Sequence, residues 1–143
     1  IKLKAQKVQL FKPYFNEQTV KMAHENGIIC NVFYADDEKE AVEMLESLSA
    51  TTHDVWTGYS VFYKKKRVTS AVVTRVRFKK LSSDEILSYV KTGEPLDKAG
   101  SYGAQGKASV FVEGIDGDFF NVVGFPLSDF YTTVMTEFGI NLW

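Results

Sequence analysis

Residues 53–80 decide the fold, and they read HDVWTGYSVFYKKKRVTSAVVTRVRFKK. Two runs rich in β-branched and aromatic residues, His53 to Tyr63 and Arg67 to Lys80, flank a stretch of lysines. Such residues favour strands. In the second run the apolar side chains fall on one face, namely Val68, Val72, Val76 and Phe78. Because side chains alternate across a strand, this pattern predicts an antiparallel hairpin with one face in a core.

Helices are expected on both sides of the hairpin. Asp36 and Asp37 suit the positive N-terminal end of a helix that reaches about Ser49. Residues 82–85 form a capping box, which predicts a second helix ending at Gly93. A third amphipathic helix is expected over residues 127–138, before Gly139.

Four further segments have weaker local patterns. Apolar spacing predicts a helix over residues 1–11, and a β-forming run predicts a strand over residues 28–34. Residues 94–108 are expected to form a loop, and residues 109–114 and 118–123 a second hairpin around an Asp-Gly turn. With no repeat or linker, these elements predict one mixed α/β domain across residues 1–143.

Composition excludes several classes of protein. Hydrophobic residues make up 45% of the 143 residues, which is too many for a disordered chain. The formal net charge of -1 provides no global positive field for nucleic acid. The single cysteine, Cys30, forms no intrachain disulfide, and no apolar run is long enough to span a bilayer. We therefore expect a cytoplasmic protein without a membrane partner.

The segment with the most chemical content is residues 93–106, which read GEPLDKAGSYGAQG. Its four glycines allow a ligand to approach the backbone closely. Lys98 supplies a positive charge for a phosphate, and the Gln105 amide both donates and accepts hydrogen bonds, as reading a base requires. Composition alone leaves an ordinary surface loop equally open.

From Glu40 to about Phe130 the chain resembles the Maf family of septum-formation inhibitor-like proteins. The matching segments are residues 40–45 (EAVEML), 48–58 (LSATTHDVWTG), 74–78 (TRVRF), 93–106 and 117–127 (GDFFNVVGFPL). The resemblance implies an elongated, mixed α/β fold, similar to inosine triphosphatases, with two lobes around a nucleotide cleft. It also implies a nucleoside-triphosphate pyrophosphatase that clears modified or pyrimidine nucleotides from the pool, uses Mg²⁺ or Mn²⁺, and leaves a homodimer open.

The resemblance also assigns residues to roles. Lys98 and Gln105 match the family's binding loop, and Lys7 resembles the lysine of its Leu-Ala-x-x-Lys helix. The family's Ser-x-Ser-Pro-Arg-Arg loop has no counterpart, so the domain is expected to be incomplete at its N-terminus. Its Gly-Ala-Asp-Thr motif falls near residues 20–26, which read VKMAHEN. His24 or Glu25 is the candidate replacement for the catalytic aspartate, although two solvated helix residues are the favoured interpretation.

Two alternatives to the enzyme stay open. One is a catalytically weak or inert nucleotide-binding homologue or fragment, which the missing motifs favour. The other is a nucleic-acid-binding module that uses the basic segment 64–67, against which the net charge argues. Trp56 and the pair Phe119 and Phe120 are expected in the core.

Overall fold

The computed structural model describes residues 7–10, 21, 25, 29–32, 35, 37–141 and 143. The chain divides into two compact units. The first comprises residues 1–46 and 83–103, and the second comprises residues 47–82 and 104–143. Both contain helices and strands, which confirms the predicted mixed α/β class with an antiparallel sheet and flanking helices.

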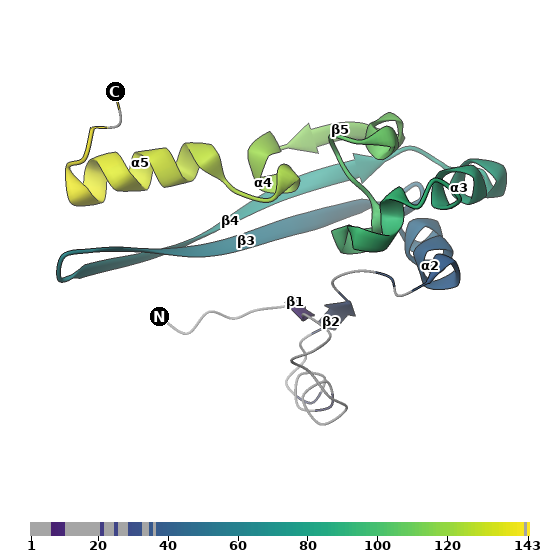
Figure 1. Ribbon diagram of the computed structural model, residues 1–143, viewed down its shortest axis with the longest axis horizontal. Coiled ribbons are helices and arrows are strands. Elements are labelled where there is room, and N and C mark those ends of the chain that lie inside the picture. Colours follow the sequence, from purple (N-terminus) through teal and green to yellow (C-terminus); the bar gives the residue numbers. More distant parts are fainter. Residues whose placement is uncertain are drawn as a thin grey trace. The chain divides into compact units, whose positions relative to one another are not determined.

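The second unit is built on the hairpin that the sequence predicts. Strands β3 (Thr52–Tyr63) and β4 (Lys66–Phe78) pair antiparallel, and β5 (Val112–Asp116) adds to β4 (Figure 1). Along β4, burial alternates from residue to residue, and Val76 and Phe78 are almost fully buried. The inward face of the hairpin therefore forms the core of this unit.

Trp56 lies on the opposite face of the hairpin, so its expected place in the core is wrong. Its register partner is Val73, and the neighbouring pair on that face is Asp54 and Arg75, which form an ion pair. The strand period of two puts all four side chains on one side, and Trp56 is 60% exposed. Alternation therefore outweighs the hydrophobicity of one aromatic ring.

The predicted second hairpin is also wrong, because residues 118–123 do not form a strand. Helix α4 (Phe119–Val123) begins there, and the Asp118 carboxylate accepts hydrogen bonds from the backbone N–H groups of Phe120, at 2.8 Å, and Asn121, at 3.4 Å. A capping carboxylate of this kind starts a helix even in a β-forming sequence. Phe119 and Phe120 are 41% and 49% exposed, so they are not core residues either.

Helix α5 (Leu127–Phe138) ends at the left-handed Gly139, as predicted, and packs along the hairpin (Figure 1). The Tyr59 hydroxyl donates to the Asp129 carboxylate at 2.6 Å, and the Ser70 hydroxyl donates to the same oxygen at 2.8 Å. Hydrogen bonds to a charged group of this length are among the stronger ones. They fix the first turn of α5 against both strands.

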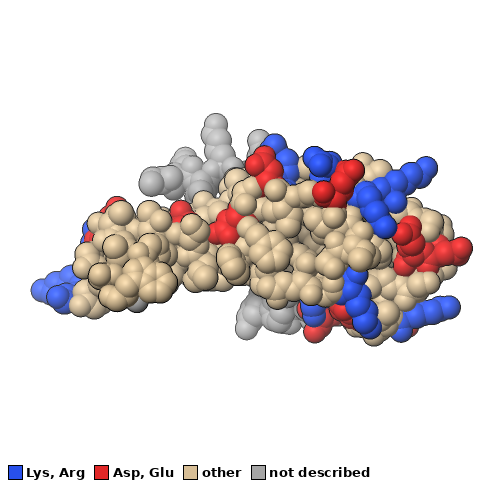
Figure 2. All heavy atoms as spheres, turned by 90° about the horizontal axis from the view of Figure 1, so that it is seen from above, with Lys and Arg blue, Asp and Glu red and all other residues tan. Residues whose placement is uncertain are grey.

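The lysine-rich turn that joins β3 to β4 is exposed, and basic side chains project from that end of the hairpin (Figure 2). Lys66 donates to the Glu137 carboxylate at 3.0 Å and lies over the Phe138 ring. Lys64 lies over the ring of Tyr63. Part of the basic segment is therefore used in contacts within the unit.

In the first unit, β1 (Lys7–Leu10) and β2 (Ile29–Val32) pair in parallel, with Lys7 opposite Ile29. The strand predicted over residues 28–34 is confirmed at residues 29–32, and residues 28, 33 and 34 lie outside the described residues. The helix predicted over residues 1–11 is wrong at β1, because its backbone pairs with a segment distant in the sequence, which local periodicity does not reveal.

Two further helices match their predictions. Helix α2 (Glu38–Leu48) begins after Asp37, whose carboxylate accepts from the Glu40 N–H at 2.9 Å. Helix α3 (Ser83–Val90) has three buried side chains, Ile86, Tyr89 and Val90. None of the helices described is both long and apolar enough to cross a membrane.

Candidate functional site

The glycine-rich segment begins where α3 ends. Gly93 has a left-handed backbone (φ 75°), a conformation that glycine adopts without steric cost. A 3₁₀ helix, η2 (Glu94–Asp97), follows, and its Pro95 is buried. Two more 3₁₀ helices, η3 (Ala99–Ser101) and η4 (Lys107–Phe111), continue the segment. The expected irregular loop is thus a series of tight turns, and the strand predicted at residues 109–111 is wrong.

The backbone of η3 is constrained at two consecutive residues. Gly100 has φ 68° and Ser101 has φ 61°, a region that residues other than glycine rarely adopt. The Ser101 side chain is fully buried, and its hydroxyl donates to the Met44 sulfur at 3.1 Å. Strained backbone of this kind persists only where the surrounding structure holds it, and it concentrates at binding sites.

Lys98 connects η2 and η3 in an extended conformation. Its side chain is 39% exposed, and its ammonium pairs with the adjacent carboxylate of Asp97, which is 78% exposed. An exposed ion pair contributes little to stability, because water screens it and the side chains lose entropy. The ammonium can therefore exchange this partner for a phosphate at small cost.

Gln105 is exposed and lies in the second unit, whereas Lys98 lies in the first. Its amide is available to solvent, which suits a group that has to form hydrogen bonds with a ligand. The two predicted contacts, phosphate to Lys98 and base to Gln105, stay separate predictions.

Tyr89 is a feature of the site that sequence reasoning missed. Its side chain is only 5% exposed, and its hydroxyl donates to the Glu94 Oε1 at 3.1 Å and accepts from the backbone N–H of Gly103. Burial raises the pKa of Tyr89, and the nearby Glu94 raises it further by a smaller amount. Burial also raises the pKa of Tyr102. Helical spacing can indicate that a tyrosine is buried, but it carries no signal for the contacts of its hydroxyl.

The remaining candidates are Lys7, His24 and Glu25, which come earlier in the sequence. Lys7 lies in β1 instead of a helix. Glu25 is exposed and helical, and His24 lies outside the described residues. In the part of the chain that the structure describes, no group of three metal-ligating side chains occurs. The roles of these three residues stay predictions.

A second polar cluster, also missed by the sequence, lies in the second unit. Asn121 is 1% exposed, and its amide nitrogen donates to the Val55 carbonyl at 3.0 Å and to the Thr74 hydroxyl at 3.0 Å. The Thr74 hydroxyl also donates to the Asp118 carbonyl at 3.0 Å. These bonds tie α4 to both long strands. A buried neutral amide and hydroxyl give this cluster a structural role without acid–base chemistry.

Comparison with protein families shows to which family the chain belongs. The model of Maf-like proteins matches residues 3–137, which include the whole glycine-rich segment. The chain belongs to the Maf family. The resemblance inferred from the sequence is thereby confirmed.

Curated Maf relatives are similar over part of their length. The dTTP/UTP pyrophosphatase of Thermococcus onnurineus (strain NA1) is 50% identical over 103 residues, which are 72% of this chain and 56% of that protein. The dTTP/UTP pyrophosphatase of Clostridium botulinum (strain Kyoto / Type A2) is 50% identical over 108 residues, 74% of this chain and 55% of that protein. The chain thus spans about half the length of the curated relatives it matches.

Proposed function

We propose that this chain binds a pyrimidine nucleoside triphosphate on residues 93–106, and that the whole protein hydrolyses it to the nucleoside monophosphate and pyrophosphate. The observation that carries the proposal is the presentation of Lys98, a half-exposed cation on a tightly constrained, glycine-rich backbone. The similar proteins are named dTTP/UTP pyrophosphatases, which supports a pyrimidine triphosphate as the ligand.

In this proposal the residues of the chain have distinct roles. The Lys98 ammonium binds a phosphate oxygen, and a charge-assisted contact of this kind contributes about 1.5–3 kcal/mol. The glycines of the segment let the phosphates approach the backbone. Gln105 forms hydrogen bonds with the edge of the base and so distinguishes one base from another.

The proposed metal is Mg²⁺ or Mn²⁺. Mg²⁺ in nucleotide sites is usually held by one or two carboxylates together with the phosphates. Asp97 fits this requirement, since its carboxylate is 78% exposed and adjoins Lys98. A bound metal would neutralise charge on the phosphates. The proposal therefore assigns Asp97 as the metal-binding carboxylate of the segment.

The second candidate function is nucleotide binding with weak or absent turnover by this chain. Residues 20–26 contain no aspartate, and the one carboxylate among them, Glu25, is exposed. A positioned general base contributes roughly 10²- to 10⁴-fold to the rate. We therefore propose that the 143-residue chain retains binding even where its hydrolysis is weak.

Calorimetry with UTP and dTTP in Mg²⁺ tests the binding, with uridine as the control that lacks phosphates. We expect both triphosphates to bind and uridine to bind much more weakly. Equal binding of uridine and UTP, or no binding of either triphosphate, would contradict the proposal.

Pyrophosphate release from UTP, dTTP and CTP, measured for the chain and for Glu25→Gln, separates the two candidates. Weak release in both proteins agrees with the second candidate. Full release that Glu25→Gln abolishes would make Glu25 the base and would remove the second candidate.

The proposal has three further parts. The protein lies in the cytoplasm, it is either a monomer or a homodimer, and it binds no nucleic acid. Cell fractionation and light scattering test the first two. Titration with RNA and DNA at two salt concentrations tests the third, because binding through phosphates falls steeply as salt increases.

A further inference from the structure

One buried hydroxyl connects the two ends of the segment that carries Lys98. Tyr89 donates to Glu94, the first residue of η2, and accepts from the backbone of Gly103. Glu94 and Gly103 are nine positions apart, and Lys98 lies between them. We call the Tyr89 hydroxyl with these two partners the hydroxyl clamp.

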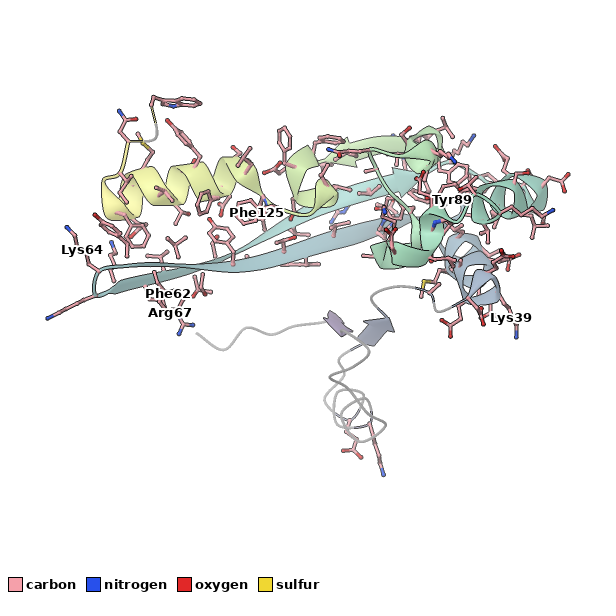
Figure 3. The ribbon with its side chains drawn as sticks, in the orientation of Figure 1. Lys39, Phe62, Lys64, Arg67, Tyr89 and Phe125 are labelled. Atoms are coloured by element: carbon pink, nitrogen blue, oxygen red, sulfur yellow. The ribbon has the colours of Figure 1, made fainter. Side chains whose placement is uncertain are left out.

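The tyrosine ring of the clamp is buried. Tyr89 belongs to α3, where its side chain is labelled in Figure 3, and Ile86 and Val90 of the same helix are both 2% exposed. A rigid ring gives its hydroxyl a defined position. Two hydrogen bonds on that hydroxyl then restrict where the segment starts and where it ends.

Between the two partners of the clamp, the backbone forms short turns. The Lys98 N–H donates to the Pro95 carbonyl at 3.1 Å, and the Ser101 N–H donates to the Lys98 carbonyl at 3.0 Å. Both bonds close short 3₁₀ turns, whose geometry is poorer than that of an α-helix. The left-handed backbone of Ser101 adds strain to the same turns. Such turns depend on contacts with the rest of the unit to keep one conformation, and the clamp acts beside the bond from the Ser101 hydroxyl to the Met44 sulfur.

We propose that Tyr89 is a positioning residue of the nucleotide site, and that its hydroxyl holds the backbone on which Lys98 meets phosphate. The inference rests on the proposed function for the identity of the ligand. Tyr89 itself touches no ligand, because its hydroxyl is engaged by Glu94 and Gly103. Its effect on binding passes through the conformation of η2 and η3.

Hydrogen exchange of the free protein tests the positioning without any nucleotide. Tyr89→Phe keeps the ring in the core and removes only the hydroxyl. We expect the amides of Lys98 and Ser101 to exchange roughly fivefold to tenfold faster in this variant. Neither amide bonds to Tyr89, so loss of a purely local contact would leave both rates unchanged, and that result would overturn the proposal.

Variants of Glu94 test the clamp from its other side, with the tyrosine intact. Glu94→Gln keeps an oxygen that accepts from Tyr89, whereas Glu94→Ala removes it. We expect faster exchange of the Lys98 and Ser101 amides in Glu94→Ala and restored protection in Glu94→Gln. Equal exchange in the two variants would contradict the clamp, and this comparison holds even where Tyr89→Phe fails to fold.

The matched control is Tyr59→Phe, which removes a second tyrosine hydroxyl bound to a carboxylate, in the other unit. With UTP and Mg²⁺, we expect Tyr89→Phe to raise the Kd roughly fivefold and Tyr59→Phe to leave it unchanged. An equal rise in both variants would show a general loss of structure and would overturn the positioning role. Absence of UTP binding by the unmodified chain would overturn the proposed function, while the exchange rates would still decide the clamp.

Discussion

The two polar regions of the molecule, the glycine-rich segment and the cluster around Asn121, use polar groups in opposite ways. Asn121 is buried, and its amide nitrogen donates to the Val55 carbonyl on β3 and to the Val72 carbonyl and the Thr74 hydroxyl on β4. Lys98 and Asp97 are partly or largely exposed, and their ion pair joins two neighbours in the sequence. The cluster around Asn121 is therefore more buried than the ion pair of Lys98 and Asp97.

This difference separates stability from binding. A buried, hydrogen-bonded amide contributes to folding, because its removal leaves buried partners without hydrogen bonds. An exposed charge on a constrained backbone contributes little to folding and remains available to a ligand. Substitutions in the two regions should accordingly change different measurements.

The largest effect is expected for Asn121→Ala. Loss of the amide leaves the Thr74 hydroxyl and two strand carbonyls with fewer hydrogen bonds and opens a cavity, which should lower the free energy of unfolding by about 3 kcal/mol. Urea unfolding measures this change. Asn141→Ala, at an exposed asparagine, is the control and should change it by less than about 0.5 kcal/mol.

The separation of stability from binding would be contradicted if Asn121→Ala weakened UTP binding by the folded protein as strongly as it weakens folding. Its Kd for UTP, measured well below the unfolding transition, is expected to stay unchanged.

Ser101→Val is expected to have a smaller effect, which should change both the free energy of unfolding and the Kd for UTP. A β-branched residue is poorly tolerated at φ 61°, and the site is fully buried, so the free energy of unfolding should fall by about 2 kcal/mol. The Kd for UTP should rise as well, because η3 adjoins Lys98. Ser101→Gly, which adopts this backbone freely, serves as the control, and equal losses in the two variants would show that φ is not the cause.

The pH dependence of unfolding tests the burial of Tyr89. Its pKa is raised above the ordinary value of about 10, so the folded state holds the proton longer than the unfolded state. Stability from this difference is complete below pH ~10 and falls as pH rises towards the folded pKa, by at most about 1.4 kcal/mol per pH unit. Alkaline urea titrations should show a shallower decline in Tyr89→Phe, and an identical slope would contradict this account.

The smallest effect is expected for Gln105→Ala. A neutral amide that reads the base changes selectivity by about 1 kcal/mol, so the preference for UTP over CTP should fall roughly fivefold. Competition calorimetry measures the ratio of the two Kd values. An equal loss of affinity for both nucleotides would assign Gln105 a role other than base recognition.

Local sequence patterns predicted the parts of the fold that have a strong period. The alternation along β4 and the apolar stripe of α5 identify the strand and the helix, because burial on one face repeats at the period of each element. The Asp37 cap and the Gly139 end were predictable for a different reason, because both groups act within one helical turn.

The errors occur where a single contact decides the structure. Residues 119–123 are β-forming in composition, yet the Asp118 carboxylate begins a helix there. Lys7 to Leu10 has helical spacing, yet it pairs with Ile29–Val32 in a parallel ladder. A cap and a long-range strand partner leave little trace in local periodicity.

For the candidate site, sequence reasoning located the segment but not its support. Glycine content and the family resemblance pointed to Lys98 and Gln105. The buried Ser101 with positive φ and the contacts of the Tyr89 hydroxyl depend on three-dimensional packing. Neither a serine nor a buried tyrosine is unusual enough in sequence to reveal such roles.

The most direct test of the central claim is the affinity of Lys98→Ala for UTP in Mg²⁺, measured by calorimetry. Loss of a charge-assisted phosphate contact should raise the Kd by roughly tenfold to a hundredfold, with an unchanged free energy of unfolding. Lys91→Ala removes an exposed lysine of the same unit, outside the glycine-rich segment, and should leave the Kd unchanged. Equal affinity in Lys98→Ala and the unmodified chain would contradict the assignment of this segment as the phosphate-binding site.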